Sequence, residues 1–116
     1  MIALALSLQA AAALPAPPAD WTDLPELPLS TARAALDPSG YVRREIEAGR
    51  CRPESSTLAS SVAVLMDADG RVARVVPRAI GCSTVEQFTA GYVSALARRM
   101  GPMKPGWYRH TVTYRW

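Results

Sequence analysis

The hydrophobic and polar positions along this chain predict two β-strands joined by a tight turn near its middle. Residues 62–76 read VAVLMDADGRVARVV, so two runs rich in β-branched side chains flank the sequence DADG at 67–70. An Asp-Gly pair between such runs predicts a hairpin, because Gly70 readily adopts the positive φ that the turn needs. The rest of the chain is expected to be arranged around this hairpin.

The two strands are predicted over about 58–67 and about 71–78. The first has apolar groups on both faces, which is typical of a central strand. In the second, alternation places Val72 and Val76 on one face. Pro77 has no N–H to donate to a ladder, so this strand lies at an edge of the sheet or ends there.

A first helix is predicted over about 38–48, where apolar residues recur at helical spacing. Asp37 is the expected N-cap and Gly49 the expected C-terminal stop. A further helical turn or two is predicted over 30–36, with Ser30 as its cap.

A second and longer helix is predicted over 83–101. Ser83 and Glu86 are spaced as a capping box, in which each side chain satisfies a backbone N–H near the helix start. Gly91 inside this helix predicts a close approach of its backbone to the sheet. The apolar face consists of Val85, Phe88, Tyr92, Leu96 and Met100.

The last ten residues, WYRHTVTYRW, alternate strictly and predict a strand over 107–116. One face is expected to be buried and carries Tyr108, His110, Val112, Tyr114 and Trp116. The other is polar and basic, is expected to meet solvent or a partner, and carries Trp107, Arg109, Thr111, Thr113 and Arg115. The order of elements therefore predicts a small αββαβ domain of the α+β class, with a three-stranded antiparallel sheet packed against two helices.

The N-terminal part is predicted to lie outside this domain. Residues 1–19 are identified as a signal peptide, because an uncharged apolar run too short to span a bilayer is followed by small residues. A buried helix or an uncleaved short anchor are the alternatives. Residues 20–36 are predicted to be a Pro-rich linker that is extended and poorly packed, with Trp21 docked on the domain. The domain itself is assigned to 37–116.

Composition is that of an ordinary globular protein, with 49% apolar and 20% charged residues. The net charge of +3 is unevenly spread. Residues 20–69 hold nine acidic side chains against five arginines, whereas residues 70–116 hold eight basic side chains against Glu86 alone. This asymmetry indicates an acidic partner or, more simply, a solvated basic face.

Cys51 and Cys82 are the only thiols. In an exported chain they are predicted to form a disulfide, which contributes about 3–4 kcal/mol by closing a loop of about 32 residues. A redox or metal-binding pair is the alternative, although the chain has neither a CxxC motif nor a histidine cluster. The single histidine, His110, is expected to be a hydrogen-bonded core or rim residue. We expect no enzymatic activity, no cofactor and no metal.

The order of these pieces resembles the C-terminal domain of TonB, the periplasmic energy-transducing protein. The similarity covers residues 37–116. It rests on Tyr41 opening a short helix, the SSVAVLMDADGRVARVV hairpin, a capped helix ending in ARR at 97–99, the Gly101-Pro102 break and the alternating last strand. The resemblance implies a periplasmic location and a link to TonB-type energy transduction or to transport across the outer membrane.

The predicted function is protein binding through β-strand pairing. A three-stranded sheet leaves open edges, and an extended segment of an envelope or outer-membrane protein can pair with the last strand. The candidate contact residues are Arg109, Thr111, Thr113 and Arg115. An edge that pairs with nothing, or with a second copy in a homodimer, is the alternative.

Two other classes of function stay open. A nucleic-acid- or envelope-polymer-binding domain is suggested by the basic half and by aromatic residues for stacking, although a secretory leader argues against nucleic acid. The aromatic residues are Trp107, Tyr108, Tyr114 and Trp116. A small enzyme or thiol reductant is the third class. No stable membrane span is expected.

Overall fold

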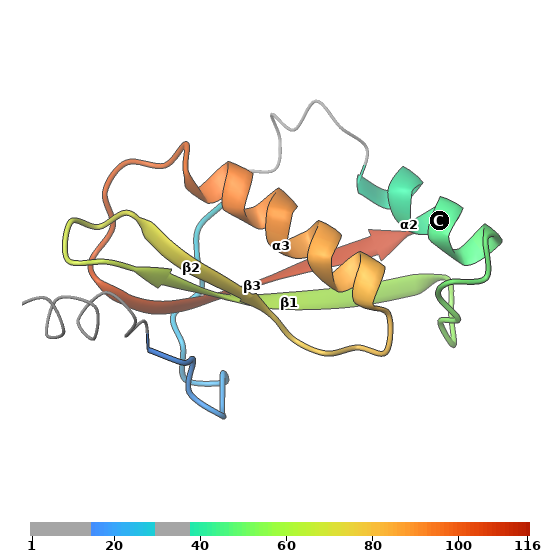
Figure 1. Cartoon of the computed structure of the whole chain (residues 1–116), viewed down its shortest axis with the longest axis horizontal. Coiled ribbons are helices and arrows are strands. Elements are labelled where there is room, and N and C mark those ends of the chain that lie inside the picture. The colour runs from blue at the N-terminus through green and yellow to red at the C-terminus, as the bar shows by residue number, and fades with distance from the viewer. Residues whose placement is uncertain (1–14, 30–37) are drawn as a thin grey trace, which may run out of the picture.

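The computed structural model describes residues 15–29 and 38–116. Along the chain the elements are α2 (Pro38–Glu47), β1 (Thr57–Met66), β2 (Val72–Pro77), α3 (Ser83–Ala97) and β3 (Gly106–Arg115). The three strands form one antiparallel sheet in the order β2-β1-β3, and both helices cover the same face of it (Figure 1). This arrangement confirms the predicted α+β fold. The predicted signal-peptide core, the helical turns at 30–36 and the Asp37 cap lie outside the described residues.

The β1–β2 hairpin forms as predicted. Gly70 has a φ of 77°, and its N–H donates to the carbonyl of Asp67 at 2.9 Å. The Asp67 carboxylate also accepts hydrogen bonds from the backbone N–H groups of Asp69 and Arg71. The loop after α3 closes over this turn, because Met103 N–H donates to the Gly70 carbonyl at 2.9 Å.

A register irregularity in the β1–β2 pair leaves Ala73 without a partner on β1. This extra residue resets the alternation, so Val72 and Val75 both pack against the core. Val76 lies opposite Ala63 instead, on the other face. The prediction that Val72 and Val76 share a face is therefore wrong, because it assumed an unbroken two-residue period.

The start of α3 differs from the predicted capping box. The N-cap is Cys82, not Ser83, and the Cys82 side chain makes no capping hydrogen bond. Glu86 nevertheless acts as expected of the second box residue: its Oε2 accepts hydrogen bonds from the N–H groups of Cys82 at 3.2 Å and Ile80 at 3.1 Å. The helix also ends at Ala97, earlier than the predicted end.

The buried stripe of α3 is rotated from the predicted one. The fully buried residues are Val85, Thr89, Val93 and Ala97. Of the predicted apolar face, Val85 is buried, Phe88, Tyr92 and Met100 pack against the core, and Leu96 alone lies outside the core cluster. Gly91 is exposed, and a Cβ built on it meets nothing within 4 Å. The predicted close approach to the sheet at Gly91 is therefore wrong.

The core lies between the helix layer and the sheet, and Tyr114 of β3 is its largest fully buried side chain. The Tyr114 hydroxyl is hydrogen-bonded to Thr89 Oγ1 at 2.7 Å. Burial raises the pKa of Tyr114 above its usual value. Tyr41 of α2 stacks on Phe88 of α3 with ring centroids 4.2 Å apart, which joins the two helices.

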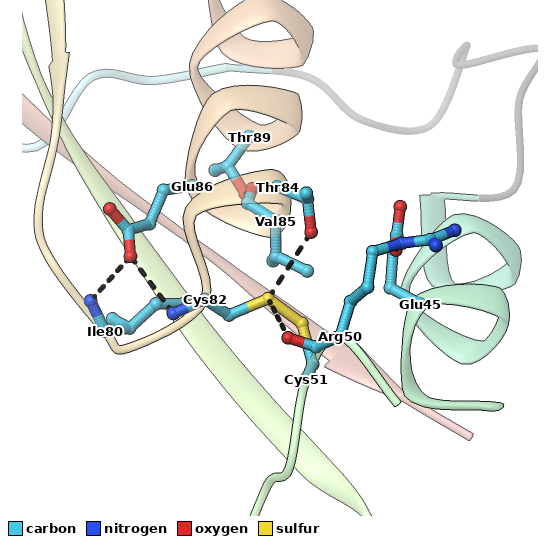
Figure 2. Close-up of a disulfide and its surroundings, with 9 residues drawn as sticks. All are labelled: Glu45, Arg50, Cys51, Ile80, Cys82, Thr84, Val85, Glu86 and Thr89. Carbon is cyan, nitrogen blue, oxygen red and sulfur yellow. Dashed lines mark hydrogen bonds and ion pairs between the residues drawn. A yellow bond between two sulfur atoms is a disulfide. The ribbon is translucent and has the colours of Figure 1, made fainter. Parts of the chain in front are cut away.

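Cys51 and Cys82 form the predicted disulfide (Figure 2). It ties the loop before β1 to the N-terminus of α3, with the two Cα atoms 5.5 Å apart. Beside it, Arg50 pairs with Glu45 of α2. The Arg50 guanidinium, with help from the Tyr41 hydroxyl, holds the pKa of Glu45 below its ordinary value. The disulfide and this ion pair together fix the loop between α2 and β1.

Candidate functional site

The candidate site is β3, which pairs with β1 along its whole length and forms one edge of the sheet. Its alternation matches the prediction. Tyr108, Val112 and Tyr114 are buried under the helices. Thr111, Thr113 and Arg115 are exposed on the opposite face.

The backbone of β3 presents hydrogen-bonding groups outward at every second residue, as an antiparallel edge strand must. Arg109 is one of the outward residues, because both its N–H and its carbonyl bond to the N-terminal segment. The same alternation directs the backbone groups of Thr111, Thr113 and Arg115 outward. The four predicted contact residues therefore share one face and one edge.

Part of this edge is covered by the chain itself. Glu26 forms a parallel bridge with Arg109. Its two hydrogen bonds run from Arg109 N–H to the Pro25 carbonyl at 3.0 Å and from Leu27 N–H to the Arg109 carbonyl at 2.8 Å. The Leu27 side chain is fully buried in the core. The segment predicted to be a poorly packed linker is thus anchored in the core by Leu27 and Leu29, while the residues at 25, 26 and 28 are exposed.

The self-pairing stops after one bridge. The Leu27 carbonyl accepts hydrogen bonds from Leu29 N–H at 2.8 Å and from His110 Nδ1 at 3.2 Å, and it does not reach Thr111. At the other end of β3, Arg115 N–H donates to Ser39 Oγ at 3.4 Å. Between these two contacts, the outward backbone groups of Thr111 and Thr113 have no hydrogen-bond partner within the described ranges 15–29 and 38–116.

The side chains around the bridge are charged. Glu26 Oε2 lies 3.4 Å from Arg109 Nε, and Glu26 Oε1 lies 3.9 Å from His110 Nδ1. Glu26 keeps 59% of its side chain exposed, whereas His110 keeps 13%. His110 is therefore the hydrogen-bonded rim residue that was predicted.

The face of the sheet opposite the helices is basic. Arg74, Arg109 and Arg115 project from it opposite residues of β1, and Arg78 lies at the end of β2. The N-terminal segment crosses this face, where the Pro15 carbonyl accepts a hydrogen bond from Arg74 Nη1 at 2.9 Å. Figure 1 shows this segment, in blue and cyan, starting on the side away from the helices and rising to the helix layer.

Trp21 docks on the domain as predicted, with the Arg78 guanidinium 4.2 Å above its ring. Next to it, the Asp20 carboxylate accepts hydrogen bonds from the hydroxyl and the N–H of Thr22, which lower the pKa of Asp20. Together with sheet residues these side chains line a small pocket: Asp20, Trp21, Thr22, Ser61, Arg78, Arg109 and Thr111. Two arginines against one aspartate give the lining a net positive charge, which favours anionic groups.

The sequence predicts the strand and its two faces but not the self-pairing at Arg109. The only local signal was a single leucine between Pro25 and Pro28, in a stretch whose prolines argue against any strand. In the part of the chain that is described, no group of three or more His, Cys, Asp or Glu residues is placed to hold a metal ion. None of the described helices is both long and apolar enough to cross a bilayer.

Comparison of the chain with protein-family models, with curated proteins and with solved structures finds no match.

Proposed function

We propose that this chain is a periplasmic protein-interaction module, similar to the TonB C-terminal domain, that binds an extended segment of an envelope or outer-membrane protein. The partner segment adds to the sheet as a further strand along β3. A link to TonB-type energy transduction or to transport across the outer membrane belongs to the same proposal. The chain's own role in it is binding, not catalysis.

The observation that carries the proposal is the open stretch of β3 edge. An edge strand with outward N–H and C=O groups is a template for another strand. At Thr111 and Thr113 these groups have no partner among the described residues, and both side chains are exposed. Arg109 and Arg115 lie on either side of this stretch and add positive charge that favours an acidic segment.

A proline substitution tests strand pairing directly. Thr111 N–H points away from β1, so Thr111→Pro removes an outward donor and leaves the β1–β3 ladder intact. We expect capture of partners from an envelope extract to fall by about tenfold or more, because a hydrogen bond is lost and the proline ring obstructs the incoming strand. The measurement is quantitative pull-down with the full chain.

Thr111→Ala is the matched control. It removes the same side chain, including the 2.7 Å hydrogen bond to Ser61, but keeps the backbone donor. Capture by this variant should stay close to that of the unmodified chain. Equal recovery of the same partners by the proline variant, shown to be folded by circular dichroism, would refute pairing at β3.

The basic face opposite the helices supports a second candidate, binding to an anionic polymer such as nucleic acid or an envelope polysaccharide. It rests on the arginines that project from the face opposite the helices. Binding through phosphate or carboxylate contacts weakens steeply as salt is raised. Affinity for such polymers that is insensitive to both salt and Arg74→Ala would rule this candidate out.

A further inference from the structure

Residues 25–29, here called the strap, occupy the same edge that the proposed function assigns to a partner. The inference that follows rests on that proposed function. The outward residues of β3 are Trp107, Arg109, Thr111, Thr113 and Arg115. The strap forms hydrogen bonds with the backbone N–H and carbonyl of Arg109, and Ser39 Oγ accepts a hydrogen bond from Arg115 N–H. Among the described residues, this leaves the outward backbone groups of Trp107, Thr111 and Thr113 without a partner, and the stretch 111–113 lies between the two contacts.

A longer partner strand can form only if the strap leaves. Along an antiparallel or parallel edge, each outward residue offers one donor and one acceptor. The strap pairs with the backbone of Arg109 alone. The Leu27 carbonyl accepts hydrogen bonds from Leu29 N–H and His110 Nδ1, and not from Thr111 N–H. A segment without the strap's proline at position 28 can continue along β3 and bond to Thr111 and Thr113 as well. Such a segment outcompetes the strap in backbone hydrogen bonds.

The strap also shows which side chains this edge accepts. Leu27 is fully buried in the core, so its departure exposes an apolar site that an incoming aliphatic side chain can fill. The preceding residue, Glu26, lies beside Arg109 and His110. A carboxylate at that position in a partner meets the same two groups. Acid followed by a large aliphatic residue is therefore the pattern that fits.

We propose that the strap is an internal occupant of the docking edge, and that the partner is an extended segment with an acidic residue followed by a large aliphatic residue. The partner segment replaces residues 25–27 and pairs with β3 in the parallel orientation, which is the orientation of the bridge between Glu26 and Arg109. A bound strap blocks the edge. The apparent affinity for a partner is therefore the intrinsic affinity multiplied by the fraction of molecules in which the strap is released.

The test measures binding of a fluorescent synthetic peptide with the sequence of residues 20–29, DWTDLPELPL, to the full chain. Leu27→Ala in the full chain weakens the strap and opens a site that the peptide's own leucine fills. We expect this variant to bind the peptide about 10- to 100-fold more tightly than the unmodified chain. A peptide with lysine and aspartate in place of its Glu-Leu pair should bind neither protein.

Glu26→Lys provides a second variant in case Leu27→Ala does not fold. Glu26 is mostly exposed, so this change breaks the contact to Arg109 without disturbing the core. We expect peptide binding to tighten about two- to fivefold. Equal peptide affinity of the unmodified chain and of the folded variants would overturn the proposal. A wild-type dimer that exchanges straps, seen as a doubled mass in light scattering, would also overturn it.

The two proposals fail separately. If strap variants leave peptide affinity unchanged but Thr111→Pro still abolishes capture, strand docking stands and the strap is only structural. If strap variants tighten peptide binding but Thr111→Pro leaves capture unchanged, strap exchange stands and the proposed docking along the rest of β3 is wrong.

Discussion

Reduction of the Cys51–Cys82 disulfide is expected to remove a large part of the stability of this domain. The bridge joins residues separated by 31 positions in the sequence. The loop-closure estimate for a loop of this length is about 3–4 kcal/mol at 25 °C. The whole free energy of unfolding of a small domain is about 5–15 kcal/mol. The melting temperature should therefore fall by about 12–30 °C, at about 4–8 °C for each kcal/mol.

The structure allows the cross-link to be separated from other effects. Cys82 is the N-cap of α3 but makes no capping hydrogen bond, so its replacement costs no cap interaction. Both sulfurs are largely buried, with residue exposures of 3% and 6%. Alanine therefore suits these positions better than serine, which would bury a hydroxyl.

The assay is urea-induced unfolding of the oxidised chain, of the chain reduced with a phosphine, and of the single and double alanine variants. Either single variant already lacks the bridge, so each should lose most of the stability that the double variant loses. If reduction changes the free energy of unfolding by less than about 1 kcal/mol, the loop-closure reasoning is wrong for this protein.

Four further substitutions test particular local interactions, and the urea midpoint of each variant measures its effect. Gly91→Ala should stabilise the chain by about 1 kcal/mol, because the position is helical, exposed and open. Gly70→Ala should instead cost more than about 2 kcal/mol of stability, since φ at Gly70 is +77° and the new methyl would collide with the backbone of Met103. The opposite order of these two variants would contradict the structure. Ser60→Ala should be neutral or stabilising by up to about 1 kcal/mol, because the described residues offer its buried hydroxyl no hydrogen-bond partner; a clear loss would show that the hydroxyl is bonded. Glu45 has a folded-state pKa below its ordinary value of 4.5, so its pairing with Arg50 stabilises the fold above that pH and is lost as pH falls through the folded-state pKa. Glu45→Gln should remove this part of the loss of stability at low pH. An identical dependence of the urea midpoint on pH for the variant and the unmodified chain would contradict the stabilising role of the Glu45–Arg50 pair.

Local rules were sufficient for most of the elements. The DADG sequence specified its own turn, because Gly70 supplies a positive φ and the Asp67 carboxylate binds nearby N–H groups. Strict alternation specified both faces of β3. Two cysteines left one pairing, and the disulfide follows from it. The turn and the strand faces depend on interactions within a few residues, and two cysteines allow only one disulfide pairing.

The predictions were wrong at positions where the folded chain departs from a regular local pattern. The extra residue Ala73 in β2 broke the alternation and moved Val75 into the core. At the start of α3, Cys82 became the N-cap, so the serine after it could not act as one. Position 91 was expected to approach the sheet, but the helix turns its stripe of Val85, Thr89, Val93 and Ala97 inward and leaves glycine outside.

The sequence by itself determined the elements, their order and the disulfide, because periodicity, turn chemistry and cysteine number act over short distances or leave no choice. Only the tertiary structure decided that Pro25–Leu27 pairs with Arg109, more than 80 positions further along the chain. Prolines around one leucine carry no strand signal, and burial of Leu27 requires a core that already exists. The partial cover of the β3 edge was therefore a property of the folded chain, which no local pattern contained.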